Sequence, residues 1–426
     1  MNASGSVSPR GVSGTGGATG AETVLEGAVR SVLGSGAGPR FPPAPTIGRS
    51  CRIFFAFDRI PIVSTFCLAQ FPVETHCFVP HKTFTLSFIE GPMISVVLLV
   101  LSVIAATVPM AIFLAVVWWL DRYDREPAWL VVTVFLWGAL FATLGSLVLN
   151  SFGGAVLVDQ LGRYNGQILG TIYIAPLVEE PMKASILLLV AMTRWFDNTT
   201  DGFVYGAAVG LGFAMTENFL YFSAYVDNPG QWIQVVVIRT ACSGVMHALA
   251  SSIVGASLGW AKCRTLDIKV VSFVMGLTTA MTVHCIWNTF AVLDRVGGLE
   301  ALTIDLAIFF VEFVMVFSVF MLCLHGEHRM IKRELMVEAK GGVLPPQHVA
   351  IIASVRKRSR PGWCPEGVAQ DEYIETATKL AFRRMQCRGR GGRQKKYVQE
   401  ARTLRHRLRA MLGTKPLPLG PGEVQP

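Results

Sequence analysis

The sequence contains little that would support an ordinary soluble enzyme or a disulfide-stabilised secreted domain. Only 16% of its 426 residues are charged, whereas 52% are hydrophobic, which is too apolar for a typical soluble protein. Its nine cysteines form no CxxC pair and no Cys/His spacing of a zinc module, so neither a disulfide framework nor a Cys-based metal site is indicated. The basic clusters near the C-terminus lack interleaved aromatic residues, so we expect no specific nucleic-acid partner.

Long apolar runs occupy the middle of the chain. A membrane-spanning helix needs about 20 apolar residues, and we count seven runs of suitable length. They cover residues 92–120, 127–150, 171–193, 202–225, 233–261, 269–292 and 300–324. The sequence therefore predicts an all-α protein, a polytopic membrane bundle of about seven transmembrane helices over residues 91–325.

The two ends of the chain differ from this middle part. Residues 1–50 are rich in Gly, Ser, Ala and Pro without periodicity, which is typical of a disordered extension or a mis-assigned translation start. Residues 51–90 are apolar but interrupted, and we expect a poorly defined pre-membrane segment there, with an eighth helix as the alternative. Residues 326–426 form a basic tail in which we predict helices over 370–386 and 393–412.

The charge distribution predicts the orientation of the bundle. From His325 to the C-terminus there are 21 Lys and Arg against 9 Asp and Glu, a net charge of +12, whereas the rest of the chain has −3. Positively charged segments next to membrane spans usually stay in the cytoplasm. We therefore expect a multi-pass protein of the cell membrane with a cytoplasmic C-terminal tail.

Several polar residues lie within the apolar runs, where they are costly. An ionised side chain at a helix centre costs about 3 kcal/mol on insertion scales and usually faces a cavity, a partner or a reacting group. Glu179 and Glu180 are adjacent in the third run. The later runs add four more such residues, Glu217, His247, His284 and Asn288.

Three of these runs place their polar residues on faces of small residues. Residues four apart lie nearly above one another on a helix, and small residues let helices approach closely in membranes. The three stripes are Gly202, Gly206, Gly210 and Ala214 before Glu217; Ser243, His247, Ser251 and Gly255; and Gly276, Ala280, His284 and Asn288. We therefore expect Glu217 and both histidines to face protein and to converge on one buried site.

Such a set of side chains is suited to activating water. A buried Glu can take a proton from water and a His can share or return it, while His284 and Asn288 could donate hydrogen bonds to a developing oxyanion. Alternatively, Glu180, His247 and His284 could bind a zinc ion. Adjacent glutamates point about 100° apart, so one serves as base and the other holds geometry through Lys183 or Arg239, but the sequence does not choose between them.

The residues also carry a resemblance to a known family. The relevant segments are DRYDREP at 121–127, APLVEEPMK at 175–183, DGFVYGAAVGLGFAMTENFLYF at 201–222, Arg239 with His247, and His284 with Trp287 and Asn288. Over residues 95–325 the sequence resembles the PrsW family of intramembrane proteases, which is related to the CAAX-processing and bacteriocin-processing membrane proteases. The wider CAAX-type pattern, EExxxR with FxxxH, is not followed here, which argues against prenylated substrates.

The resemblance implies an all-helical membrane protease. The glutamate pair and the two histidine-bearing helices would hydrolyse a peptide bond of a membrane-anchored protein. The role known for the family in bacteria is cleavage of an anti-sigma factor, whereas substrate identity does not follow from family membership. Glu217 would then be a supporting carboxylate that orients a histidine.

Three other classes of protein stay open as alternatives. A serine intramembrane protease would use Ser243 with His284 as its base, but it would leave the glutamate pair without a role. A proton-coupled transporter also places Glu and His in the membrane, although the sequence has no internal repeat. A non-catalytic membrane scaffold would tolerate replacement of Glu180 or His247.

Overall fold

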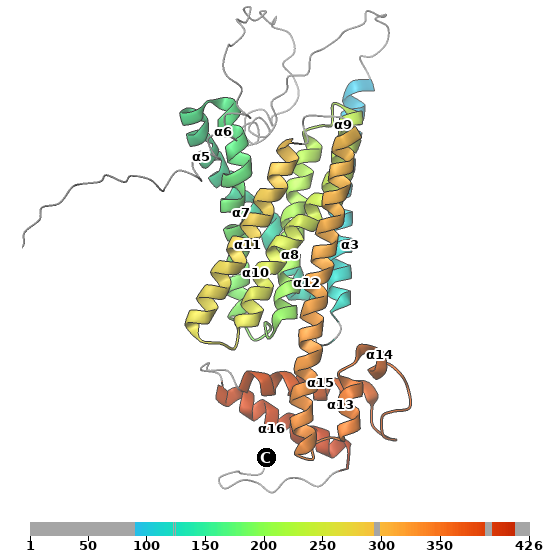
Figure 1. The fold of residues 1–426 in the computed structure, drawn as a ribbon. Coiled ribbons are helices and arrows are strands. Elements are labelled where there is room, and N and C mark those ends of the chain that lie inside the picture. The colour runs from blue at the N-terminus through green and yellow to red at the C-terminus, as the bar shows by residue number, and fades with distance from the viewer. Residues whose placement is uncertain (1–89, 122, 124, 294–298, 388–393, 414–426) are drawn as a thin grey trace, which may run out of the picture. The chain divides into compact units, whose positions relative to one another are not determined.

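The structure, a computed structural model, describes residues 90–121, 123, 125–293, 299–387 and 394–413. All regular secondary structure in these ranges is helical (Figure 1). In chain order the bundle contains α3 (Glu90–Leu120), α4 (Ala128–Trp137), η2 (Gly138–Ala142), α5 (Thr143–Leu161), α6 (Arg163–Leu169), η3 (Gly170–Ile174), α7 (Ala175–Ala191), α8 (Thr199–Ser223), α9 (Pro229–Ile238), η4 (Arg239–Ser243), α10 (Gly244–Ala261), α11 (Leu266–Leu293) and α12 (Leu299–Lys340). The elements labelled η are π-helical turns.

The predicted all-α membrane fold is confirmed, but the count of seven spans is not. Five helical stretches are long and apolar enough to cross a membrane, namely Met93–Leu120, Ala128–Leu161, Pro229–Ala261, Leu266–Val292 and Phe310–Lys340. The other two predicted spans correspond to α7 and α8. α7 has three charged residues within 17, and α8 is rich in glycine, which lowers the hydropathy of both helices.

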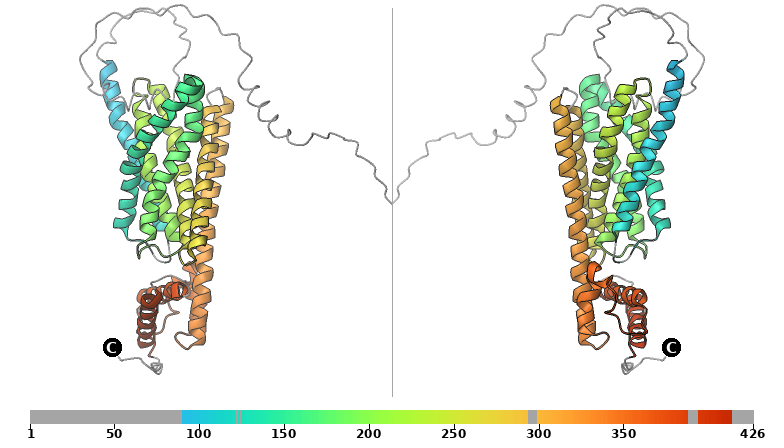
Figure 2. Two further views of the ribbon diagram at one scale, coloured as in Figure 1. Left: turned by 90° about the vertical axis from the view of Figure 1, so that its left-hand side faces the viewer. Right: turned by 90° about the vertical axis from the view of Figure 1, so that its right-hand side faces the viewer.

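α8 is the most enclosed helix of the bundle and is buried along most of its length. The views in Figures 1 and 2 show neighbouring helices around it. Its start is fixed by a capping box, in which the Asn198 side chain accepts from the backbone N–H of Asp201 and the Asp201 carboxylate accepts from that of Asn198. This cap satisfies N–H groups that a helix end would otherwise leave without partners.

The small-residue faces of α8 and α10 pack directly against each other. A Cβ atom added at Gly202, Gly206 or Gly210 would collide with the backbone of α10, at Gly255, Ser251 and His247 respectively. The predicted role of these stripes in close helix packing is thereby confirmed. As a result, the backbone of His247 lies directly against α8, the helix that carries Glu217.

The C-terminal part of the chain folds into short helices around a core of its own. These are α13 (Pro346–Ile352), α14 (Val355–Arg358), α15 (Gln370–Cys387) and α16 (Gln394–Met411). The predicted tail helices over 370–386 and 393–412 are confirmed to within one residue at each end. α12 runs without a break across the predicted boundary at residues 325 and 326, and its end packs into the core of the tail through Ile331 and Leu335.

The tail contacts two loops at the same end of the bundle. Arg383 of α15 forms an ion pair with Asp197 at 2.8 Å, and the Tyr123 hydroxyl donates to the Ala353 carbonyl at 2.7 Å. The loops with Arg125 and Arg194 therefore lie on the side of the tail. The expectations for residues 1–50, and for an eighth helix before residue 90, concern residues outside the described ranges.

Candidate functional site

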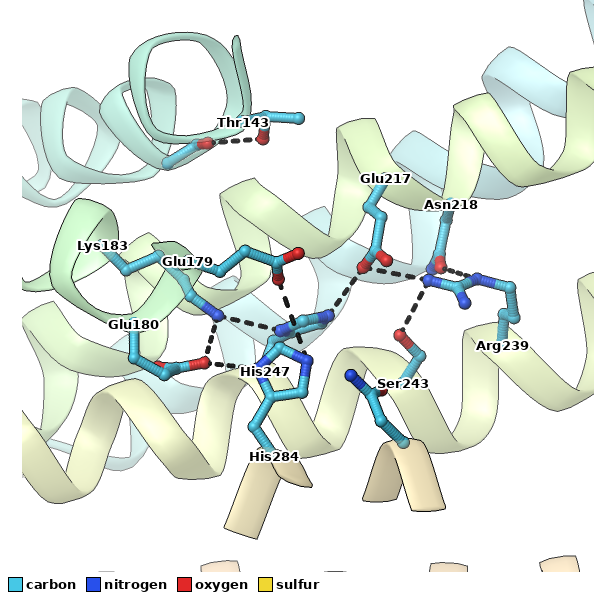
Figure 3. Close-up of polar contacts among 12 residues, drawn as sticks. Thr143, Glu179, Glu180, Lys183, Glu217, Asn218, Arg239, Ser243, His247 and His284 are labelled. Carbon is cyan, nitrogen blue, oxygen red and sulfur yellow. Dashed lines mark hydrogen bonds and ion pairs between the residues drawn. The ribbon is translucent and has the colours of Figure 1, made fainter. Parts of the chain in front are cut away.

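Four helices bring the predicted polar residues together inside the bundle. α7 carries Glu179, Glu180 and Lys183, α10 carries His247, and α11 carries His284 (Figure 3). Each of these five side chains belongs to a residue that is no more than 3% exposed. Glu217 of α8 joins them and is 8% exposed. The prediction that Glu217 and both histidines face protein is confirmed.

Glu180 is held by two positively polarised groups. Its Oε1 atom accepts from the Lys183 ammonium at 2.5 Å and lies 2.8 Å from His284 Nδ1. A carboxylate accepts hydrogen bonds, so Nδ1 of His284 is the protonated nitrogen and Nε2 keeps its lone pair. Of the two residues considered for pairing with this glutamate, Lys183 is the partner in the structure.

Glu217 holds the second histidine in the same manner. Its Oε2 atom lies 2.7 Å from His247 Nε2 and 3.0 Å from an Arg239 nitrogen. The other ring nitrogen, His247 Nδ1, lies 3.0 Å from the Lys183 ammonium, which can only donate. The tautomer of neutral His247 therefore carries its proton on Nε2 and a lone pair on Nδ1, and Glu217 orients a histidine as the sequence suggested.

Glu179 has a different environment from its neighbour. Its Oε1 atom accepts from the Asn150 amide at 3.1 Å, rather than from an ammonium or an imidazole. Its Oε2 atom, like Oε2 of Glu180, is buried without a hydrogen-bond partner. This Oε2 atom lies 3.8 Å from His284 Nε2, the nitrogen with the lone pair. A buried carboxylate oxygen without a partner is costly, and its position facing a basic nitrogen indicates a site for a water molecule or an ion.

Donor atoms of Glu179, His247 and His284 lie within 4.8 Å of one another, and this group could hold a metal ion. Both histidines have their second nitrogen on a carboxylate, which is the usual arrangement of metal-binding histidines. An ion on His247 Nδ1 would replace its hydrogen bond to Lys183. The group contains Glu179 instead of the predicted Glu180, whose Oε1 atom is engaged by Lys183 and His284.

Two of the predicted residues are engaged elsewhere. The Asn288 amide donates to the Thr171 carbonyl at 2.8 Å, so in this state it is used in joining α11 to η3. The Ser243 hydroxyl accepts from Arg239 at 3.2 Å, and no hydrogen bond between Ser243 and a histidine occurs among the described residues. The geometry thus gives no support to the serine-protease alternative.

Sequence reasoning missed several residues that complete the site. Asn150 contacts Glu179, the Phe213 ring lies 4.5 Å from the Lys183 ammonium, and the Tyr221 ring lies 3.6 Å from the Arg239 guanidinium. Arg239 also donates to the Asn218 side chain at 3.0 Å. Asn150 and Asn218 are polar residues within apolar runs, and this signal could have identified them.

The fold and the site define a class of protein, a multi-pass membrane protein with a buried centre of carboxylates and histidines suited to hydrolysis. Residues 126–322 match the sequence profile described as PrsW family intramembrane metalloprotease. Over these residues the chain is similar to the PrsW family, and the comparisons support an intramembrane peptidase of that type. The profile begins just before α4 and ends within α12, so it covers every residue of the centre.

Curated relatives support this assignment. The chain is 29% identical over 189 residues to Protease PrsW of Oceanobacillus iheyensis, covering 44% of this chain and 82% of the relative. It is 28% identical over 165 residues to Protease PrsW of Bacillus subtilis, covering 38% and 70%. Protease PrsW of Geobacillus kaustophilus is 31% identical over 143 residues, covering 33% and 58%. No solved structure shows significant similarity to the chain.

The buried pair of Lys183 and Glu180 is expected to be essential for stability. Lys183→Met removes one charge from a pair whose side chains are fully buried, and breaking such a pair lowers the free energy of unfolding by about 3–5 kcal/mol. The matched control is Lys379→Met, which removes an exposed i,i+4 pair with Glu375 and should cost about 0–1 kcal/mol. Thermal unfolding in detergent measures both, and equal shifts would contradict the assigned role of the buried pair.

Proposed function

We propose that this protein hydrolyses a peptide bond of a membrane-anchored protein, with Glu179 as the carboxylate that acts on the attacking water. The observation that carries this proposal is the unpartnered Glu179 Oε2 atom, 3.8 Å from the lone pair of His284 Nε2. A water molecule between these two atoms would donate a hydrogen bond to each. Its oxygen would then be oriented for attack on a carbonyl carbon.

In this proposal the two adjacent glutamates have different tasks. Glu179 takes a proton from water as the oxygen attacks and returns it to the leaving amine nitrogen. Glu180 acts as a positioning residue, because its hydrogen bonds fix two other members of the centre, Lys183 and His284. Glu217 does the same for His247. The Lys183 ammonium contributes a fixed positive charge close to the negative charge that develops on the carbonyl oxygen.

The predicted oxyanion donor Asn288 would act only after a rearrangement. Its amide is bound to the Thr171 carbonyl in this structure, so it would have to leave that bond to reach a substrate. Asn288 therefore stays a proposed catalytic residue. Arg239 is proposed as a supporting residue, because it forms an ion pair with Glu217.

We propose zinc as the cofactor of an alternative, metal-bound form of this centre, in which Glu179 is a ligand rather than the group that takes the proton. Glu179, His247 and His284 would hold it, and an ion of this kind polarises a carbonyl group and makes its bound water more acidic. The support is the convergence of three donors, the two carboxylate-bound histidines and the unpartnered oxygen of Glu179.

The proposed arrangement in the cell follows from the charge distribution. The catalytic bundle would comprise residues 91–325 and the basic tail, residues 326–426, would lie in the cytoplasm. The substrate would be a membrane protein cut near the opposite surface, and an anti-sigma factor stays one candidate. Transport and scaffolding remain the alternatives, and both predict that no protein is cut.

Metal analysis of the purified protein tests the proposed cofactor. If the metal-bound form is the resident one, the wild type holds about one zinc ion per chain, with strong losses in Glu179→Gln and His284→Ala because each removes a donor atom. Ser243→Ala, which leaves all three donors intact, is the control and should retain its ion. Mass spectrometry of elements measures the content, and equal zinc in all four proteins would contradict the assignment of these ligands.

Comparison of new protein N-termini in host-cell membranes tests the proteolytic function. Cells carrying the wild type should show cleavages that are absent with Glu179→Gln, because this variant cannot take the proton from water. Ser243→Ala should give the wild-type set of N-termini, since the hydrogen bond found for its hydroxyl among the described residues is the one from the supporting Arg239. Expression and thermal stability are matched first, and an identical set of N-termini in wild type and Glu179→Gln would refute the proposed function.

A further inference from the structure

A groove of about 440 Å³ lies between η3 and α11. It is lined by Ile172 and Tyr173 from η3 and by Met281, Cys285, Ile286 and Phe290 from α11, among others. The α11 part of the lining extends from Thr278 to Phe290, which corresponds to about 18 Å along a helix. The groove is therefore long enough to lie against about three turns of another helix.

The groove adjoins the hydrolytic centre along the contact between η3 and α11, which we call the seam. Cys285 of the groove follows His284 of the centre, and Ile172 follows Thr171, whose carbonyl binds Asn288 at 2.8 Å. The nearby bond from His284 to Glu180, 2.8 Å long, joins α11 to α7. Because the centre is buried, a substrate that lies in the groove would reach it by parting η3 from α11.

At the seam, η3 and α11 are joined by a side-chain hydrogen bond, the one from the Asn288 amide to the Thr171 carbonyl. In the π-helical turn the N–H of Ala175 bonds to the Gly170 carbonyl, five residues earlier. The residue five positions after Thr171 is Pro176, which has no N–H to donate. The Thr171 carbonyl takes the Asn288 amide as its partner instead, so separation of the two elements at this point breaks no hydrogen bond of the helix itself.

The chemistry of the lining fits an apolar membrane segment. The residues that line the groove include no acidic or basic side chain. The hydroxyls of Thr282 and Thr289 donate to carbonyls of their own helix. They therefore need no hydrogen-bond acceptor from a molecule bound in the groove. Tyr173 and Ile286 are more than half exposed, at 58% and 53%, and offer apolar surface to whatever lies alongside.

We propose that this groove docks the transmembrane segment of the protein substrate and delivers the bond to be cut through the seam between η3 and α11. The inference rests on the proposed proteolytic function and names the path and binding surface of its substrate. A lipid chain would also match the apolar lining. Continuity with the seam of the centre favours the substrate, because a chain bound here lies along the same two elements, η3 and α11, that Thr171 and Asn288 join.

Photo-crosslinking tests the occupant of the groove. In the Glu179→Gln background, which should bind without cutting, a benzoylphenylalanine replaces Met281 in the groove or Met275, a 65% exposed residue of the same helix that does not line it. We expect the transmembrane segments of proteins cleaved by the wild type to be captured from position 281 at least tenfold more than from position 275. Equal capture from both positions, or capture of lipid alone, would overturn the proposal.

A blocking substitution separates docking from chemistry. Met281→Trp fills the groove, and we expect it to lower cleavage of a membrane-anchored substrate at least tenfold while a short soluble peptide with the same scissile bond is cut at the wild-type rate. Met275→Trp should leave both rates unchanged. If the wild type cuts nothing, the proposed function fails; if Met281→Trp cuts the anchored substrate like the wild type, only the groove proposal fails.

Discussion

The hydrogen bonds of Lys183 to Glu180 and His247 connect the helices of the centre. This ammonium is fully buried, and one end of the contact chain continues from Glu180 to His284 while the other continues from His247 to Glu217. Four helices are joined in this way within the apolar bundle. Buried charges are tolerated only when paired and hydrogen-bonded, so the position of each member constrains the others and leaves Glu179 facing the lone pair of His284.

Close backbone packing makes this network geometrically feasible. Gly210 lets the backbone of α8 touch α10 at His247, which brings the Glu217 side chain within hydrogen-bonding distance of the imidazole. Larger residues along this face would separate the helices and lengthen that bond. Close packing of the small-residue faces therefore determines the distances between the polar groups of the centre.

Much of this arrangement could be predicted from the sequence because apolar length and four-residue spacing are strong signals in membranes. They identified the helices, the buried faces and the inward direction of Glu217, His247 and His284. The different tasks proposed for Glu179 and Glu180 were not predictable, since they depend on Asn150 and on contacts between separate helices. The bond from Asn288 to Thr171 was also missed, because it requires the π-helical turn and the missing N–H of Pro176.

The central claim is that Glu179 acts on the water while Glu180 positions His284 and Lys183. The most direct test is the single-turnover rate of one identified cleavage in Glu179→Gln and Glu180→Gln, with folding matched by thermal unfolding. The account predicts a loss of about 10²–10⁴-fold for Glu179→Gln, as expected for a base that transfers a proton, and a smaller loss for Glu180→Gln, because its amide oxygen can still accept from His284. A nearly active Glu179→Gln beside an inactive Glu180→Gln would contradict the account.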